Sequence, residues 1–167
     1  DDVRALCQDR DGNLWVGTLD HGLGRWSQDR WSWIGRAQGL SDDAVFSLVE
    51  DREGTLWVGT ETGLDRLRDG VFVTYGQDAG LLHEGVFNVV PRGAGGVWIN
   101  DAAGGVWVLE GAVARSAAPA GTSQGAGMSP LLETSDGDLW LGGTSLTRLS
   151  RGRVERYRPP TGDVTAL

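Results

Sequence analysis

Few side chains in this chain have both the type and the spacing that a reaction or a metal site requires. The two histidines, His21 and His83, stand far apart, and with the single cysteine, Cys7, they form no zinc-binding spacing. Neither histidine has a serine or cysteine nearby in a recognisable nucleophile motif. A pair of carboxylates for glycoside hydrolysis is an open alternative, because two such residues can be distant in the sequence and meet only in the fold. Nothing in the sequence singles out such a pair. We therefore expect no catalytic residue and no cofactor.

One acidic segment resembles part of a calcium-binding loop. It reads Asp9-x-Asp11-Gly12-Asn13, yet no glutamate follows at the spacing that completes the oxygen ligands of an EF-hand. A later copy of the segment replaces the first aspartate by Arg92. An acidic residue followed by glycine between apolar runs is a hairpin signal, because glycine accepts the positive φ of the turn. We predict a hairpin here and no metal site.

These residues belong to a unit that recurs along the chain. Tryptophans follow one another at steps of 42, 41 and 42 residues, and each has a glycine three residues before it. The pairs are Gly12 and Trp15, Gly54 and Trp57, Gly95 and Trp98, and Gly137 and Trp140. A period of this size is typical of solenoid and propeller arrays. We interpret these glycines and tryptophans as the structural core of the repeat.

Each unit has the length of four short strands and no room for a crossover helix, so neighbouring strands must pair antiparallel. One such sheet cannot bury both of its apolar faces, whereas radial packing of several sheets does. We predict an all-β fold, a β-propeller of four-stranded antiparallel blades, as a single region over residues 1–167. The expected blades, with the tryptophans packed between them, are 1–42, 43–84, 85–126 and 127–162. Residues 163–167 repeat the first-strand pattern and predict a fifth inner strand, so we expect a stretch of a larger propeller.

Charge and composition exclude several classes of protein. The chain has 15 Lys and Arg against 23 Asp and Glu, a formal charge of −8, which argues against a nucleic-acid groove and against an anionic membrane surface. Its 27 glycines and 8 tryptophans are spaced among apolar segments, unlike a disordered linker. One cysteine excludes an internal disulfide framework, and we expect Cys7 to be a small buried hydrophobe. No signal-like or membrane-spanning segment is evident.

Two stretches closely resemble the two-component regulator propeller repeat. They are residues 9–18 with Gly22-Leu23 and residues 51–60 with Gly63-Leu64, and residues 39–45 resemble that family's junction between blades. The resemblance implies a periplasmic or extracellular sensor region of histidine kinases, hybrid two-component proteins or some diguanylate cyclases. The resemblance also implies that the ligands of such sensors include oligosaccharides. The third unit departs from the pattern, with Arg92 in the acidic turn and Trp107 in place of a charged residue such as Asp65.

A binding site is expected at one end of the blades. The turn between the second and third strands should share that end with the connection to the next blade, and long, variable connections usually carry binding. The candidates there are Asp20, His21, Glu61, Thr62, Asn100, Asp101 and His83, with Ser41, Asp42 and Glu84 beside them. Trp31 and Trp33 alternate on an outer strand, and we expect one of the pair to be exposed. A polar, acidic rim of this kind suits hydroxyl-rich ligands.

Three functions follow as hypotheses. The first is a non-enzymatic sensor that binds a small polar ligand such as an oligosaccharide. The second is a structural or protein-binding scaffold whose partner is the remaining blades or a second copy of the chain. The third is a polysaccharide lyase or hydrolase with its site in the propeller funnel. No nucleic acid and no direct membrane contact is expected for any of them.

Overall fold

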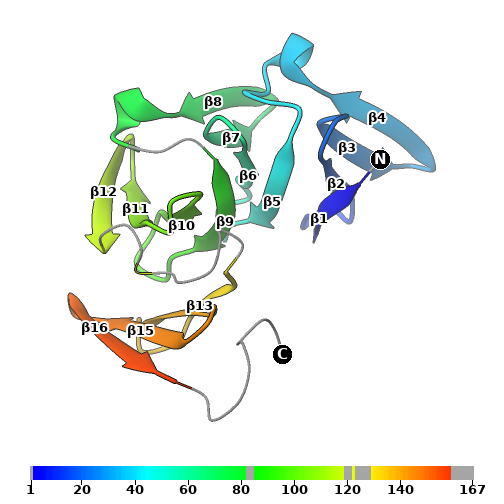
Figure 1. Ribbon diagram of the computed structural model, residues 1–167. Helices are drawn as coiled ribbons and strands as arrows, with labels where there is room; N and C mark the ends of the chain where they lie inside the picture. The colour runs from blue at the N-terminus through cyan, green and yellow to red at the C-terminus, as the bar shows by residue number, and fades with distance from the viewer. Residues whose placement is uncertain (1, 82–84, 119–121, 123–128, 159–167) are drawn as a thin grey trace.

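The computed structural model describes residues 2–81, 85–118, 122 and 129–158. Within these residues the chain forms sixteen β-strands and two short 3-10 helices. The strands group into four sheets of four, each with its strands in chain order, and every pairing is antiparallel. Figure 1 shows the sheets arranged as successive blades around a shared centre. The predicted all-β propeller of four-stranded blades is confirmed.

The strand bounds follow the repeat seen in the sequence. Blade 1 consists of β1 (Val3–Gln8), β2 (Leu14–Thr18), β3 (Leu23–Ser27) and β4 (Arg30–Ile34). Blade 2 consists of β5 (Val45–Glu50), β6 (Leu56–Thr60), β7 (Leu64–Arg68) and β8 (Val71–Tyr75). Blade 3 consists of β9 (Val86–Pro91), β10 (Val97–Asp101), β11 (Val106–Glu110) and β12 (Val113–Ala118). Blade 4 consists of β13 (Leu131–Glu133), β14 (Leu139–Leu141), β15 (Leu146–Ser150) and β16 (Arg153–Tyr157).

The first strands of the blades form the inner layer of the arc. Strand β1 contacts β5, β5 contacts β9 and β9 contacts β13, so successive blades meet along their first strands. The 3-10 helices η1 (Arg36–Gln38) and η2 (Gln77–Ala79) lie in the connections from blade 1 to blade 2 and from blade 2 to blade 3. The fifth inner strand expected at 163–167 lies outside the described residues.

Glycine makes the turn between the first and second strands of each blade possible. Gly12, Gly54, Gly95 and Gly137 all have φ between 82 and 95°. An L-amino acid with a side chain is strained in that region, which explains why each unit has a glycine at this position. The resulting hairpins fix the register that places each tryptophan on the same face of its blade.

The tryptophans pack in the seams between blades, as predicted. Trp15 lies in one apolar cluster with Leu23 of blade 1 and Leu56 of blade 2. The corresponding clusters contain Trp57 in the seam between blades 2 and 3 and Trp98 in the seam between blades 3 and 4. These three indoles are buried, whereas Trp140 is half-buried, because no described blade covers its side of blade 4.

Small residues let neighbouring blades approach closely near the inner layer. A Cβ on Gly17 would lie 2.5 Å from Cγ1 of Val45, and a Cβ on Gly59 would lie 2.5 Å from the carbonyl oxygen of Val86. The equivalent residue of blade 3 is Asn100, whose neighbour Asn88 donates from Nδ2 to the carbonyl of Ser129, at 2.8 Å, in blade 4. The third seam therefore has a polar contact near the inner layer, where the first two have a glycine against an apolar neighbour.

Candidate functional site

The two ends of the blades differ in construction. At one end, called the connection end, the turn between the second and third strands of a blade contacts the chain that leads into a first strand. That first strand belongs either to the next blade or to the same blade. Gly22 N donates to the carbonyl of Asp43 at 2.9 Å, and Ala102 N donates to the carbonyl of Gly85 at 2.9 Å. The other end, called the hairpin end, carries the tight turns at residues 9–13, 51–55, 92–96 and 134–138. The predicted sharing of one end by turns and connections is confirmed.

On blade 1, two predicted residues of the connection-end turn and two predicted indoles of β4 come together. His21 Nδ1 lies 2.9 Å from Asp20 Oδ1, and the His21 ring meets the Trp33 ring edge-on with centroids 6.4 Å apart. The rings of Trp31 and Trp33 stack at 5.8 Å with an interplanar angle of 17°. Both indoles are half-exposed, at 49% and 50%, so the structure exposes the pair rather than one member. Trp26 extends this aromatic row, with its centroid 5.2 Å from that of Trp31.

At the connection end of blade 2, Glu61 and Thr62 are exposed on the turn after β6. The strongest polar contacts there belong to Asp65, a buried residue on β7. Its carboxylate accepts hydrogen bonds from Ser41 N at 2.9 Å and Ser41 Oγ at 2.6 Å, and from Thr74 Oγ1 at 2.6 Å. The available signal for Asp65 in the sequence is that a charged residue stands between the apolar residues of β7. The carboxylate ties the connection between blades 1 and 2 to β7, so its role is structural.

At the connection end of blade 3, Asn100 and Asp101 are buried. Asp101 accepts from Gly105 N and from Trp107 Nε1, each at 2.7 Å. Asn100 donates from Nδ2 to the Gly105 carbonyl at 3.0 Å, and its Oδ1 has no hydrogen-bond partner among the described residues. Both side chains stabilise the turn after β10 and neither lies on an open surface. Trp107 stands where blade 2 has Asp65, and the Asp101 carboxylate accepts the hydrogen bond of its indole N–H.

Two of the residues expected at this end, His83 and Glu84, lie outside the described residues. Of the others beside the connections, Asp42 caps its own turn. Its Oδ1 accepts from Ala44 N at 3.0 Å, and Oδ2 lies 3.4 Å from Arg36 Nη1. The predicted site residues thus form one surface group on blade 1, are exposed on the turn of blade 2 and stabilise the turn of blade 3.

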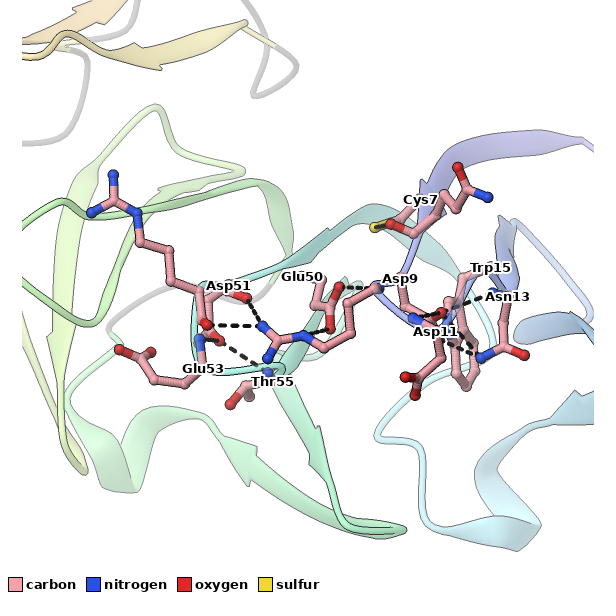
Figure 2. Close-up of polar contacts among 12 residues, drawn as sticks. Cys7, Asp9, Asp11, Asn13, Trp15, Glu50, Asp51, Glu53 and Thr55 are labelled. Carbon is pink, nitrogen blue, oxygen red and sulfur yellow. Dashed lines mark hydrogen bonds and ion pairs between the residues drawn. The ribbon is translucent and has the colours of Figure 1, made fainter.

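At the hairpin end, an aspartate joins each of the first two turns to its tryptophan. Asp9 accepts hydrogen bonds from Asp11 N, Asn13 N and Asn13 Nδ2, and from Trp15 Nε1 at 2.8 Å (Figure 2). Asp51 accepts from Trp57 Nε1 at 2.7 Å in the same way. Burial acts to raise the pKa of Asp9, but the hydrogen bonds from Asn13 and Trp15 outweigh it and lower that pKa below its usual value. The carboxylate accepts hydrogen bonds from its own turn and from the tryptophan of the following strand, so it stabilises the predicted hairpin.

An arginine connects the hairpins of blades 1 and 2. Arg10 Nε donates to Glu50 Oε1 at 2.9 Å, and the Arg10 backbone N donates to Glu50 Oε2 at 2.7 Å (Figure 2). The Arg10 Nη2 group also donates to the carbonyls of Asp51 and Arg52, at 3.1 and 2.8 Å. One guanidinium thus contacts both the acidic side chain and the turn backbone of the next blade. This contact is called the Arg10 clasp below.

The hairpin end also carries surface hollows, which the sequence did not indicate. One lies between blades 1 and 2 and is lined by Asp9, Arg10, Trp15 and Glu50 among others. Another hollow, of about 550 Å³, lies between the hairpins of blades 3 and 4, with its lining at residues 90–94 and 132–137 and at Arg52. The available sequence signal was the exchange of aspartate for Arg92 in the third unit. That exchange changes the charge of the turn, whose other residues, Pro91, Gly93 and Ala94, also differ from those of blade 2.

Two further observations bear on chemistry. Cys7 is half-buried against the first seam, and this burial is the main cause that raises the pKa of its thiol. Within the described ranges, no three His, Cys, Asp or Glu side chains form a group that holds a metal ion, and no helix is long and apolar enough to cross a bilayer.

Comparison with solved structures supports the propeller assignment. Virginiamycin B lyase from Staphylococcus aureus superposes with a TM-score of 0.75 at 14% identity, covering 95% of this chain and 56% of the lyase. The extracellular domain of a protein described as a hybrid two-component system of B. thetaiotaomicron superposes with a TM-score of 0.77 at 19% identity, covering 96% of this chain and 25% of that one. A gluconolactonase from Xanthomonas campestris gives 0.70 at 14% identity, covering 96% and 63%. At these identities the likeness establishes the fold alone.

The chain spans about half the length of the lyase and a quarter of the two-component protein. No curated protein matches the sequence. The sequence pattern described as "Two component regulator propeller" matches residues 1–20 and 39–62. These segments contain the hairpin of blade 1, the junction between blades 1 and 2, and the hairpin and tryptophan strand of blade 2. The two-component regulator propeller pattern is thus matched in these two segments, and the chain as a whole folds as a four-blade β-propeller arc.

Proposed function

We propose that this chain is a non-enzymatic, ligand-sensing propeller region of a bacterial receptor of the two-component type. The ligand is a small polar molecule such as an oligosaccharide, bound on the exposed Trp31–Trp33 face of blade 1 next to the Asp20–His21 turn, in the periplasm or outside the cell. The single observation that carries the ligand site is the exposed stack of Trp31 and Trp33 beside the His21–Asp20 pair. The family pattern at residues 1–20 and 39–62 and the two-component neighbours support the receptor class.

The surface of blade 1 suits a sugar for physical reasons. Two stacked indoles present a flat apolar face, which large aromatics use for contact at little cost in conformational freedom. Asp20 accepts hydrogen bonds from hydroxyl groups, and a ring nitrogen of His21 offers a donor or an acceptor according to its tautomer. A half-exposed apolar patch with a polar margin on a folded protein usually marks an interaction site.

The carboxylates at this end favour binding over catalysis. Asp65 and Asp101 are each saturated by two or more donors within the fold, so their oxygens are engaged in turn structure. Asp20, which is exposed, lies against His21 on the blade surface rather than facing a second carboxylate in the described part of the chain. An acid–base pair for glycoside hydrolysis requires two carboxyl groups on opposite sides of one bond.

A panel of neutral and acidic oligosaccharides tested by thermal shift and calorimetry examines this function. A ligand that binds only the folded state at about 100 times its Kd adds about 2.7 kcal/mol to the free energy of unfolding. Trp33→Ala should remove that stabilisation, whereas Tyr157→Ala, which truncates an exposed aromatic on blade 4, should retain it. Release of shortened sugars would show an enzyme instead, and equal binding by the Trp33 variant would place the site elsewhere.

A second candidate function, self-assembly of a scaffold with a second copy of the chain, rests on a specific observation. Leu6, Leu14 and Trp31 are exposed on the side of blade 1 that has no covering blade in the described chain. The residues at the same register in blade 2, Leu48, Leu56 and Phe72, pack against blade 1 in the first seam. The same face that forms seams inside the arc is thus uncovered on blade 1.

Light scattering over a range of concentrations distinguishes the two candidates. Self-assembly predicts a mass that rises above 17.8 kDa with concentration and falls back in Leu6→Asp, since a charge on that face opposes burial. A chain that is monomeric at all concentrations and still binds a sugar would support the sensing function and rule out the scaffold.

A further inference from the structure

An arginine recurs at one position on the third strand of the blades, beside the tryptophan of the second strand. Arg25 of β3 pairs with Trp15 in the sheet, and its Cζ lies 5.3 Å from the Trp15 ring centroid. Arg148 of β15 pairs with Trp140 in the same register, and its Cζ lies 5.7 Å from that ring centroid. The two guanidinium groups have equivalent places, so their partners can be compared directly.

In blade 4 two carboxylates hold this arginine. Arg148 Nε donates to Asp138 Oδ2 at 2.7 Å, and Arg148 Nη1 lies 3.5 Å from Glu155 Oε2. Asp138 stands two residues before Trp140, and Glu155 is the residue of β16 that pairs with Arg148 in the sheet. A guanidinium over the ring is thus placed to form charge-assisted hydrogen bonds with carboxylates.

In blade 1 both of these carboxylates are replaced by neutral residues. Asn13 stands two residues before the tryptophan, and its side-chain amide donates to Asp9 at 3.0 and 2.8 Å. Ser32 is the residue of β4 that pairs with Arg25. The Nε atom of Arg25 is buried without a hydrogen-bond partner, and no described residue forms an ion pair with its guanidinium. Arg25 therefore lacks the partners that its equivalent in blade 4 has.

Arg25 lines the hollow between blades 1 and 2, which has a volume of about 490 Å³. Trp15 lines the same hollow, so the hollow lies beside the ring that Arg25 covers. Apolar side chains form much of the remaining wall, and all of them pack in the first seam: Ile34, Leu56, Leu67 and Phe72. Apolar walls with a few placed polar groups are the common form of a site for a small molecule.

The other charges around this hollow are nearly balanced, and most of them are engaged. The lining has three arginines and four carboxylates: Arg10, Arg25, Arg68, Asp9, Asp11, Glu50 and Asp69. Glu50 binds Arg10, and Asp9 accepts N–H groups of its own hairpin. Arg68 lies 3.8 Å from Asp69, and the remaining carboxylate lies on the exposed tip of the first hairpin. Because the lining has one more carboxylate than arginine, it does not attract anions in general, and an anion must also gain from the apolar walls.

We propose that this hollow binds a small monocarboxylate with an apolar body, such as an aromatic or branched aliphatic acid. The carboxylate pairs with the Arg25 guanidinium, as two carboxylates of the chain pair with the equivalent arginine in blade 4. The apolar body lies against Leu67 and Phe72 of blade 2, so the ligand contacts both blades. Neither Trp31 nor Trp33 lines the hollow, so this site is separate from the proposed sugar site.

Titration of the whole chain with sodium benzoate at constant ionic strength tests the site. Two-dimensional ¹⁵N–¹H spectra follow the Nε–H signal of Arg25, which Arg25→Gln identifies by its loss. This signal should shift in a saturable way, with half-saturation at about 1 mM, as fits a ligand of this size. Benzyl alcohol has the same ring without the charge, and acetate has the charge without the ring. Each should bind at least about tenfold more weakly than benzoate.

A pair of variants at Ser32 tests whether a carboxylate of the chain can take the place of the ligand. Ser32→Glu places a carboxylate opposite Arg25, as Glu155 stands opposite Arg148, and should weaken benzoate binding by about tenfold because the two carboxylates compete. Ser32→Gln adds a side chain of nearly the same shape without the charge, and it should leave the half-saturation point unchanged.

A second pair compares two arginines. Arg25→Gln should weaken benzoate binding by at least about tenfold, measured by calorimetry because the Nε–H signal is lost. Arg66 has the equivalent place in blade 2, and its Nε is also buried without a partner, but it does not line the hollow. Arg66→Gln is therefore the matched control and should bind benzoate as the parent chain does.

Three results would overturn the proposal. The first is the absence of a saturable shift of the Arg25 signal with benzoate. The second is binding of benzyl alcohol or acetate as tight as that of benzoate, and the third is full affinity in Arg25→Gln. If Arg25→Gln does not fold, the Ser32 pair decides, and equal benzoate binding by Ser32→Glu and Ser32→Gln counts against the site. None of these results affects sugar binding at Trp31 and Trp33, so the two proposals fail separately.

Discussion

The seam between blades 1 and 2 and the seam between blades 3 and 4 have the same strand register but different polar contacts at the hairpin end. In the first seam, Asp9 holds Trp15 and the Arg10 clasp joins the two hairpins. In the third seam, Arg92 covers Trp98, and a backbone N–H of Gly93 is what reaches Glu133. The difference shows that seams with the same apolar register and the same turn glycines can carry different polar contacts at the hairpin end.

The largest expected effect separates covered from uncovered tryptophans. Trp57→Ala removes an indole buried between two blades and should lower the free energy of unfolding by about 3–5 kcal/mol. Trp140→Ala truncates a half-buried indole on the uncovered side of blade 4 and should cost about 1–2 kcal/mol. Chemical denaturation followed by circular dichroism measures both. Equal losses would mean that burial between blades is not what distinguishes these positions.

The next effect concerns how closely blades approach. Gly59→Ala places a Cβ 2.5 Å from the backbone oxygen of Val86, so the second seam must open, at a cost of about 1–3 kcal/mol. Gly76→Ala is the control, because a Cβ there meets no atom within 4 Å, and it should change stability by less than about 0.5 kcal/mol. A tolerated Gly59→Ala would contradict the view that blades 2 and 3 are in close contact at this glycine.

The Arg10 clasp is tested by two arginines at equivalent positions. Arg10→Ala loses the bonds to Glu50 and to two turn carbonyls and should cost about 1–2 kcal/mol, because part of this contact is solvent-exposed. Arg52→Ala should cost less than about 0.5 kcal/mol, since Pro91 stands in blade 3 where Glu50 stands in blade 2. Thermal unfolding of the two variants side by side measures the difference. Similar losses for both would show that the side chain acts through packing rather than through the clasp.

The smallest effect is a dependence on pH. The folded pKa of Asp9 is lowered, so its contribution to stability is fully present above the unfolded pKa of about 3.9 and is lost as pH falls through the folded value. Asp9→Asn should therefore lose about 1 kcal/mol at neutral pH and show a flatter decline below about pH 4. Unfolding midpoints measured from pH 7 downward give the curve. Asp11→Asn, which removes a charge from the same hairpin but no acceptor of Trp15, should keep the slope of the parent.

Much of the fold was predictable because it depends on local rules. The glycines before each tryptophan reveal the hairpins, and the apolar alternation around Trp57 reveals a strand with two buried neighbours. The shared end of turns and connections follows from antiparallel topology and was confirmed by the bond from Gly22 N to Asp43. The exposure of both Trp31 and Trp33 was only half predicted, because exposure depends on whether another blade covers that face.

The site was harder to predict because it depends on partners distant in the sequence. Asn100 and Asp101 have the residue types of a binding rim, yet the turn after β10 folds over them and uses their side chains internally. His21 and Trp33 meet because β3 and β4 pair in a register that brings the ends of the strands together. The hollow between the hairpins of blades 3 and 4 is lined by residues of different blades, so the sequence of one unit does not reveal it.

The sequence by itself determined the period, the strands, the turns and the face on which each tryptophan lies, because these follow from alternation and from backbone conformations that glycine allows. Tertiary structure decided which carboxylates remain available and which donors lack an acceptor. Those outcomes depend on contacts between residues about one repeat apart, as between Arg10 and Glu50, and on contacts between strands of one blade, as between Arg92 and the Trp98 ring.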